Sequence, residues 1–522
     1  MPKTFLNIFL VVISTISSRI LGLLRDILIF ASFGTSALNS AFILAFTLPN
    51  LFRRLLGEGA LNAALVPTLT EELEENGEKG VFQFINQVLT RVLFILLIVV
   101  ATLGLTLLAI DFIPGLNDRW YLGVELGIVL LPYLVLICLA AIIHAGLSVL
   151  KRFTLAALSP VWLNLSMIVF LGGFGFYLAE SSIERVAYLC GGVIIGGIFQ
   201  LILPAVSLNR KGWYPSFDLQ GTARMNEFVS LYLPGLAGAA IYQINIVVTR
   251  FLAFWLDDAA VSILYLANRL LELPLGVFAI AVTTVLFPSL SQFAARNDLP
   301  GFTDVFHQGL RMIIAITIPA AMGLIILREP ILNLLFVWGV FKSNDVMQTM
   351  PVVFTLALAL PFYAIGGFTT RGFYALKDTR TPYRLAIINF IVNLFFSLIL
   401  MGTLGVIGLA IANVLASVVH TFVLYWMLGK KIPTLKFGSI ALPIIKIIIA
   451  SFTMSCITVF FWSKVNSSMS DPKLAAIIAI FIIMPTAIIS YFSLLWVFRF
   501  DELKELWAFI ISVFKRRNRV ST

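Results

Sequence analysis

The sequence predicts an all-α polytopic membrane protein, and three observations carry that prediction. Hydrophobic residues make up 60% of the chain and charged residues only 12%, and the mean hydropathy is +1.01. Apolar stretches of roughly 20 residues, the length that crosses a bilayer, follow one another along most of the 522 residues. The lysines and arginines gather in alternate loops. These features exclude a soluble globular protein.

Fourteen stretches are long and apolar enough to be predicted as transmembrane helices. We place them at residues 5–30, 37–58, 85–110, 124–149, 156–179, 185–208, 227–255, 259–289, 307–327, 349–374, 382–402, 405–429, 439–463 and 473–498. The first stretch follows Lys3 in the manner of a signal peptide, but Arg19, Arg25 and Asp26 interrupt it. We therefore expect it to be a retained helix.

The basic residues are distributed unevenly between the two sides of this topology. Of 36 lysines and arginines, 26 lie at the chain ends or beside the loops after even-numbered helices, 6 lie in the other loops, and 4 lie within helices. This positive-inside pattern predicts a plasma-membrane protein with both termini in the cytoplasm. It also accounts for the net charge of +10 through contact with anionic membrane lipids, without a nucleic-acid partner.

An internal repeat is visible at an offset of about 222 residues. Ser40-Ala41-Phe42 parallels Ser262-Ile263-Leu264, and Ser159-Pro160 opens the fifth predicted helix as Thr381-Pro382 opens the eleventh. Because six helices is an even number, the two halves run in the same direction. The predicted domains are two six-helix bundles at 1–215 and 216–432, two extra helices within 433–498, and a basic amphipathic cytoplasmic tail at 499–522.

Charged side chains within the predicted helices carry most of the functional information, because each is costly in hydrocarbon unless a partner or water surrounds it. They cluster in the first, second and eighth helices: Ser18, Arg19, Arg25 and Asp26; Arg53, Arg54 and Glu58; and Asn268, Arg269 and Glu272. Guanidinium groups stay ionised and bind phosphate oxygens bidentately. The excess of arginine predicts a cavity for a phosphate or diphosphate.

Simpler interpretations exist for some of these residues. Arg269 and Glu272 have the three-residue spacing of an intrahelical ion pair. Arg53 and Arg54 fit ordinary positive-inside anchors. Arg19 and Arg25 have only Asp26 nearby in the sequence, so a purely structural role explains them least well.

Motifs for catalysis and cofactor binding are lacking from the sequence. It contains no Walker-type phosphate loop, no metal-ligand spacing and no arrangement of a nucleophile with a base. We therefore predict a transporter rather than an enzyme, with no cofactor and no bound metal.

Three motifs are similar to those of a known family. They are Ser18-Arg19-Ile20-Leu21-Gly22-Leu23-Leu24-Arg25-Asp26, then Leu48-Pro49-Asn50-Leu51-Phe52-Arg53-Arg54 with Gly57-Glu58-Gly59-Ala60, and Asn268-Arg269-Leu270-Leu271-Glu272-Leu273-Pro274-Leu275-Gly276-Val277-Phe278. Together they resemble the MurJ (MviN) lipid II flippases, within the superfamily of multidrug, oligosaccharidyl-lipid and polysaccharide exporters. The similarity covers essentially the whole chain.

The resemblance implies a function and a site. The function is translocation of the undecaprenyl-diphosphate-linked peptidoglycan precursor, lipid II, to the outer leaflet of the bacterial inner membrane by alternating access. The implied headgroup contacts are Arg19, Arg25, Arg53 and Arg269, with Ser18, Asp26, Glu58 and Asn164 around them. Helices thirteen and fourteen would form a groove for the lipid tail, and the cell-wall synthesis machinery would be a partner.

The sequence departs from the family pattern at three places. Ser40 and Asn268 stand where an acidic residue is often seen, and Thr249, followed by Arg250, stands where some members have a sodium-ligating aspartate. These departures argue against a sodium site like theirs. They favour the membrane potential as the driving force, with a monovalent cation gradient as the alternative.

Four other functions are alternatives to this interpretation. A related flippase would carry another polyprenyl-diphosphate-linked glycan, and a cation-coupled drug exporter would favour an acidic cavity over the arginines. A membrane enzyme acting on the same lipid would need a catalytic carboxylate, yet Asp26 and Glu272 each stand near arginine, which lowers their basicity. An anion channel would conduct ions rather than move lipid.

Overall fold

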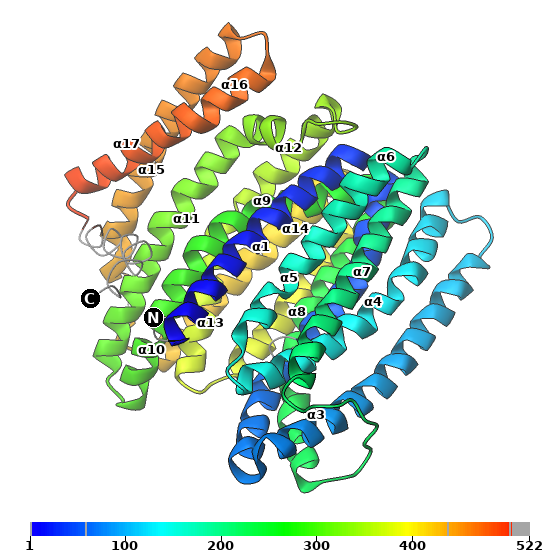
Figure 1. Ribbon diagram of the computed structural model, residues 1–522. Helices are drawn as coiled ribbons and strands as arrows, with labels where there is room; N and C mark the ends of the chain where they lie inside the picture. Colours follow the sequence, from blue (N-terminus) through cyan, green and yellow to red (C-terminus); the bar gives the residue numbers. More distant parts are fainter. Residues whose placement is uncertain (1–2, 58–59, 436–437, 501–502, 504–522) are drawn as a thin grey trace. The chain divides into compact units, whose positions relative to one another are not determined.

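The computed structural model describes residues 3–57, 60–435, 438–500 and 503, and among these it contains helices and no β-strand (Figure 1). The chain forms two compact units. Unit 1 consists of Met1–Ser262 and Trp338–Lys342, and unit 2 consists of Ile263–Val337 and Ser343–Thr522. The predicted tail at 499–522 lies almost entirely outside the described residues.

Unit 1 is built around α4. Its helices are α1 (Lys3–Phe33), α2 (Ala37–Phe52), the π-helical turn η1 (Arg53–Gly57), α3 (Ala60–Asp111), α4 (Asp118–Val149), α5 (Phe153–Ile168), the π-helical turn η2 (Val169–Gly175), α6 (Phe176–Leu178), α7 (Ser182–Asn209) and α8 (Ala223–Leu256). The apolar helix α4 packs against α2, α3 and α7, and α1 lies along α5 (Figure 1). Leu130, Tyr133 and Leu134 of α4 are fully buried, as expected for a helix that is apolar on all sides.

The end of α1 and the start of α2 are stabilised by a local helix cap and by the segment 338–342. Ser36 caps α2 by accepting a hydrogen bond from the Asn39 backbone N–H at 3.3 Å. The segment 338–342 docks on α1, where the Val340 N–H donates to the Ala31 carbonyl at 2.8 Å. Gly339 has φ +56°, and a Cβ there would lie 2.3 Å from the Ala31 carbonyl oxygen, so both the conformation and the close approach require glycine.

The linker between the predicted bundles is tied to α3. Trp213 donates its indole N–H to the Asn86 side-chain oxygen at 2.9 Å, and Arg91 donates to the Gln220 carbonyl at 2.6 Å. The Asp218 N–H donates to the Thr90 hydroxyl at 3.1 Å. These bonds hold the linker against unit 1 from residue 213 to residue 220.

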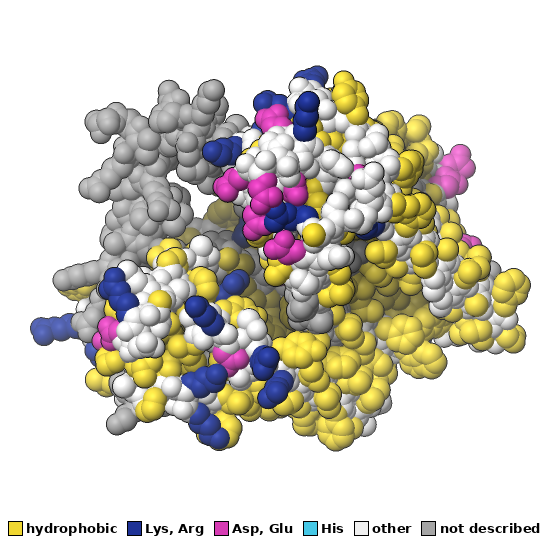
Figure 2. Space-filling view, turned by 90° about the horizontal axis from the view of Figure 1, so that it is seen from below, with side chains coloured by type: hydrophobic (Ala, Val, Ile, Leu, Met, Phe, Trp, Pro, Cys, Tyr) yellow, Lys and Arg dark blue, Asp and Glu magenta, His cyan; other side chains and the backbone are white. Residues whose placement is uncertain are grey.

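An acidic cluster surrounds Arg224 where α8 begins. Arg224 forms ion pairs of 2.5 Å with Glu71 and 2.6 Å with Glu75, and it also contacts Glu72 and Glu227. Figure 2 shows such a group of magenta side chains gathered around dark blue atoms. The glutamates of this cluster at positions 71, 72 and 75 belong to α3, which is kinked at Gly77 with φ +67°.

Unit 2 contains the remaining helices, and the boundary between the units falls near the start of α9. They are α9 (Ala260–Pro274), the π-helical turn η3 (Leu275–Ala279), α10 (Ile280–Ala295), α11 (Leu299–Phe336), α12 (Ser343–Ala357), α13 (Leu360–Ala375), α14 (Arg380–Lys431), α15 (Gly438–Ser468), α16 (Pro472–Ile478), the π-helical turn η4 (Ala479–Ile483) and α17 (Met484–Val497). The long helix α11 packs against α10, α12, α13, α15 and α16. Buried Phe302, Phe306 and Phe368 are part of the core.

The loop before α14 is fixed by one carboxylate. Asp378 accepts hydrogen bonds from Lys431 Nζ at 2.5 Å and from the Thr381 hydroxyl at 2.6 Å. Helix α14 contains two predicted transmembrane stretches. Gly405, with φ +59° and ψ −137°, breaks the helix between them. Glycine adopts this left-handed conformation without strain.

The equivalent serines of the repeat meet. Ser40 donates its hydroxyl to the Ser262 hydroxyl at 3.3 Å, and the Ser262 backbone N–H donates to Ser40 at 3.3 Å. Both side chains are fully buried. Positions that correspond in the two halves of the sequence are therefore neighbours within unit 1.

The polytopic fold that the sequence predicts is confirmed. Each predicted transmembrane stretch falls on a helix or a helix pair wherever the structure describes it. Within the described part of the chain, eight helices are long and apolar enough to cross a membrane, and the bent pair α12 and α13 makes a ninth. The total of fourteen spans is consistent with these helices and stays a prediction, as do the predicted domain boundaries.

Candidate functional site

Four of the predicted site residues form one hydrogen-bond network in unit 1. Arg25 donates from Nε and Nη2 to Asp26 Oδ1 at 3.0 and 2.6 Å. Its Nη1 donates to Asn164 Oδ1 at 2.9 Å, and Asn164 Nδ2 donates to the Ser18 carbonyl at 3.2 Å. Asn164 thus joins α5 to two positions of α1 that are about two turns apart.

The helix spacing explains why these residues meet. Ser18 and Arg25 are seven residues apart, which places them on one face of α1, and α5 packs along that helix. The Asp26 side chain is 0% exposed and that of Arg25 is 12% exposed. Charge-assisted hydrogen bonds are the means by which a buried ion pair offsets its loss of hydration.

Arg19 of α1 is in a more exposed position than Arg25. It is six residues before Arg25, about 9 Å along the helix axis, and it is exposed on the surface of the described chain. The exposed Arg19 and the ion-paired Arg25 therefore occupy different environments on the same helix.

The second helix ends in an altered turn that carries Arg53. Pro49 cannot donate a backbone hydrogen bond, and the helix continues beyond Phe52 as the π-helical turn η1. Arg53 is half-buried there and Arg54 is exposed. Glu58, which was predicted to lie beside them, is outside the described residues.

Arg269, in unit 2, forms the intrahelical ion pair with Glu272 that was predicted as the alternative to a headgroup contact. Its Nη1 is 2.9 Å from Glu272 Oε2, the intrahelical ion pair that the three-residue spacing allows. The two side chains are 24% and 59% exposed. Because the Glu272 side chain is open to solvent, the pair contributes little to stability.

One contact was missed by sequence reasoning. Arg250 of α8 donates from Nη1 to the hydroxyl of Thr47 on α2. The two residues are 203 positions apart, so no local pattern predicts their contact. An arginine within a predicted transmembrane helix does, however, indicate that a polar partner is present. Thr47 and Arg250 are therefore added to the polar positions of unit 1.

Within the part of the chain that the structure describes, no group of three or more His, Cys, Asp or Glu side chains is arranged to hold a metal ion. The candidate site of unit 1 instead combines arginines, an amide and hydroxyls with one carboxylate, Asp26, which is bonded to Arg25. Such a set binds anions by charge and by hydrogen bonding. The arrangement is chemically suited to an anionic ligand.

A family model described as "Lipid II flippase MurJ" matches residues 29–481 of the chain. This chain belongs to the MurJ lipid II flippase family. The match excludes residues 1–28, so it does not include the motif that carries Arg19 and Arg25.

The MurJ relatives are similar over most of their length. A protein of Bdellovibrio bacteriovorus named "Probable lipid II flippase MurJ" is 29% identical over 512 residues, covering 97% of this chain and 96% of the relative. Proteins of the same name from Rhizobium meliloti and Vibrio cholerae are 32% and 31% identical, and each alignment covers about 80% of both chains.

Solved structures support the same family. A lipid II flippase MurJ in an inward closed conformation matches with a TM-score of 0.78 and 27% identity, covering 94% of this chain and 99% of that one. An inward-facing multidrug transporter of the MATE family and MOP superfamily matches with a TM-score of 0.65 at 16% identity. The second similarity is one of fold alone. The MurJ family therefore shares its fold with multidrug transporters.

Proposed function

We propose that this chain is a lipid II flippase that moves the undecaprenyl-diphosphate-linked peptidoglycan precursor from the cytoplasmic to the outer leaflet by alternating access. The observation that carries the proposal is the MurJ family match over residues 29–481. Arg25 and Asp26, which lie before the matched range, and Asn164 within it form a hydrogen-bond network that supports the proposal. Relatives named for lipid II flipping, similar along nearly the whole chain, support the same cargo.

Electrostatics favours a multiply charged anion as the ligand of unit 1. The first two predicted spans contain four arginines and two carboxylates, Asp26 and Glu58. Arg19, Arg25 and Arg53 are the proposed contacts to the diphosphate, since guanidinium groups bind phosphate oxygens bidentately.

The orientation follows from charge. The 26 basic residues on one side of the predicted topology against 6 on the other support a multi-pass protein of the bacterial inner membrane with both termini in the cytoplasm. The precursor would then enter from the side that carries the linker at 213–220. The cell-wall synthesis machinery is the expected partner on the opposite side.

The proposed driving force is the membrane potential. Thr249 and Arg250 occupy the stretch where some members of the family have a sodium-ligating aspartate, and Arg250 donates to Thr47. A cation site is disfavoured beside a guanidinium group, because like charges repel. A net displacement of charge would instead couple directly to the potential.

The test combines genetic rescue with a direct assay of the cargo. Cells depleted of their own flippase would receive this chain, and precursor exposed on the outer leaflet would be measured by enzymatic labelling. We expect growth and outer-leaflet precursor with the wild type, and neither with Arg19→Ala. Arg119→Ala is the matched control, since Arg119 pairs with Asp258 at 3.0 Å away from the network.

Two other outcomes would replace the proposal. Absence of both growth and precursor exposure, with the wild-type chain present in the membrane, would favour another polyprenyl-linked glycan as cargo. Chemical change of the precursor on incubation with purified protein would assign an enzyme. Full rescue by Arg19→Ala and also by Arg53→Ala would remove the proposed anion site while leaving the family assignment intact.

A further inference from the structure

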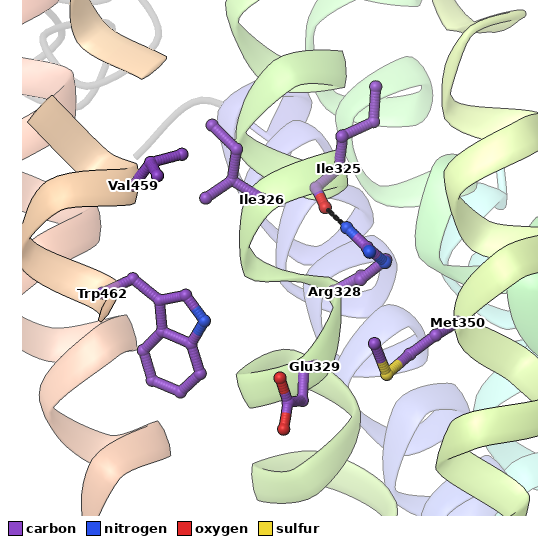
Figure 3. Close-up of a pocket in the computed structure, with 7 residues that line it drawn as sticks. All are labelled: Ile325, Ile326, Arg328, Glu329, Met350, Val459 and Trp462. Atoms are coloured by element: carbon purple, nitrogen blue, oxygen red, sulfur yellow. Dashed lines mark hydrogen bonds between the residues drawn. The ribbon is translucent and has the colours of Figure 1, made fainter. Parts of the chain in front are cut away.

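Unit 2 contains a cavity that the proposed transport site does not use. Its volume is about 270 Å³, and it lies between α11, α12 and α15 (Figure 3). Ligand pockets for drug-sized molecules start at about 300 Å³, so the cavity has the size of a small polar group such as a lipid headgroup. Its walls combine aliphatic side chains with Arg328, Glu329 and Trp462.

The two charges of this cavity do not neutralise each other. Arg328 and Glu329 are successive residues of α11, so their side chains leave the helix about 100° apart. In Figure 3 Arg328 extends toward Met350 of α12, whereas Glu329 lies on the side of Trp462 of α15. The cavity therefore presents a cation toward one helix and a carboxylate toward another.

Their partners within the protein are few. Arg328 donates from Nη1 to the carbonyl of Ile325, and its guanidinium carbon lies 5.6 Å from the centre of the Phe354 ring. Arg328 Nε is buried and has no hydrogen-bond partner. Among the described residues, Glu329 has neither a hydrogen-bond nor an ion-pair partner. Unpaired opposite charges lining one cavity are suited to a ligand that carries both signs.

The position along the helices places the cavity at a membrane surface. Arg328 is eight residues before the end of α11 and Trp462 is six before the end of α15, about 12 and 9 Å along each axis. Helix α11 has 38 residues and is about 57 Å long, well beyond the ~30 Å of the hydrocarbon core. Tryptophan is enriched at the headgroup level.

We propose that this cavity binds the headgroup of a zwitterionic phospholipid with a primary ammonium group, as in phosphatidylethanolamine. The phosphate would lie against Arg328, and the ammonium against Glu329 and the face of Trp462. Ile326 and Trp462 also pack beside the buried cluster of Leu327, Ala479 and Ile483, an apolar surface along which acyl chains can lie. In the proposed orientation this end of unit 2 faces the outer leaflet.

Other lipid headgroups fit the charges less well. An anionic glycerol headgroup leaves Glu329 unpaired beside a negative ligand. A choline headgroup satisfies Trp462 by a cation–π contact, but a quaternary ammonium has no N–H to donate to the carboxylate. The expected preference is phosphatidylethanolamine, then phosphatidylcholine, then phosphatidylglycerol.

The test measures lipid binding to the purified full chain by native mass spectrometry in neutral detergent, without any precursor. We expect about tenfold tighter binding of phosphatidylethanolamine than of phosphatidylglycerol, the ratio for roughly 1.4 kcal/mol. Glu329→Gln should abolish this preference, and Arg328→Gln should weaken binding of both lipids. Lys464→Gln is the control, because Lys464 lies near the same end of α15, stacks on Phe460 and does not line the cavity.

Equal binding of the two lipids to the wild type, or an unchanged preference in Glu329→Gln, would overturn the proposal. Glu329→Gln is isosteric and removes no internal bond, so it keeps the test valid even where Arg328→Gln fails to fold. Soluble glycerophosphoethanolamine distinguishes the source of the chemistry: binding as tight as that of the lipid would exclude a lipid site. Because transport is not measured, failure here leaves the proposed flippase function untouched.

Discussion

Arg25 donates two hydrogen bonds to a single oxygen of Asp26, one from Nε at 3.0 Å and one from Nη2 at 2.6 Å. With Nη1 bonded to Asn164, three donors of the guanidinium group fix its plane against α5. The pair is therefore both a structural element and a candidate part of the anion site. Experiments on it must separate stability from transport.

The Arg25 ion pair should behave differently in single and double variants. Arg25→Ala leaves Asp26 charged and buried, which typically costs about 3–5 kcal/mol of stability. Adding Asp26→Asn removes the uncompensated charge and should recover part of that loss. We expect the double variant to unfold at a higher temperature than Arg25→Ala in detergent, yet to give no growth in a depletion rescue.

Growth of the double variant distinguishes a structural role of Arg25 from a role in transport. A double variant that regains stability and also supports growth would limit Arg25 to a structural role. Asn164→Ala serves as an intermediate case, since it removes two hydrogen bonds of about 1 kcal/mol each but leaves the ion pair in place.

Arg269 and Glu272 should have unequal effects although they form one ion pair. Glu272 is 59% exposed, and an intrahelical pair of this kind contributes about 0.2–0.5 kcal/mol. Glu272→Gln should therefore change the unfolding temperature little. If Arg269 binds the precursor, only Arg269→Gln should lower outer-leaflet precursor, by roughly tenfold or more for a lost charged hydrogen bond. Equal precursor levels in the two variants would contradict the binding role.

Gly339 should tolerate no side chain. Its left-handed backbone costs about 1–2 kcal/mol for other residues, and a Cβ would lie 2.3 Å from the Ala31 carbonyl oxygen. Gly339→Ala should lower the unfolding temperature through loss of the contact between 338–342 and α1. Gly323→Ala is the control, because a Cβ at that helical position meets nothing within 4 Å. Similar unfolding temperatures for the two variants would show that the docked segment is dispensable.

The carboxylate at the start of α14 should give a pH-dependent contribution to stability. Burial would raise the pKa of Asp378, but hydrogen bonds from Lys431 and Thr381 outweigh it and lower the pKa from 3.8 to about 2. A pKa that is lower in the folded state stabilises the fold above about pH 4, and this contribution is lost as the pH falls toward 2. Asp378→Asn should therefore unfold at a lower temperature than wild type at pH 7, with the difference shrinking below pH 4.

The control for this prediction is Asp304→Asn, which removes an exposed carboxylate of α11. Its unfolding temperature at pH 7 should be close to that of the wild type. A constant difference between Asp378→Asn and wild type from pH 7 to pH 3 would show that the Lys431 contact does not depend on ionisation.

The helical architecture could be predicted from the sequence because transmembrane segments are read from local hydropathy. The same applies to Arg269 and Glu272, whose contact depends only on three-residue spacing. Arg25 and Asp26 were also recognisable, since adjacent opposite charges in an apolar helix must be accommodated together.

Long-range partners were not predictable from local patterns. Nothing in the residues around Thr47 indicates a bond to Arg250, and the role of Asn164 came from family resemblance rather than from spacing. The binding of residues 213–220 to α3 was also unforeseen, because side-chain bonds to loop carbonyls leave no periodic signal. In each case the information lies in how helices pack, which hydropathy alone does not specify.

The hydrogen bond between Ser40 and Ser262 has an evolutionary consequence. In an ancestral homodimer of six-helix chains, this would be an isologous contact, where one residue meets its own copy across a twofold axis. A hydroxyl can satisfy such a self-contact because it both donates and accepts, whereas two ionised carboxylates would repel each other there. In this chain both positions hold serine, so the contact forms between equivalent positions of one polypeptide.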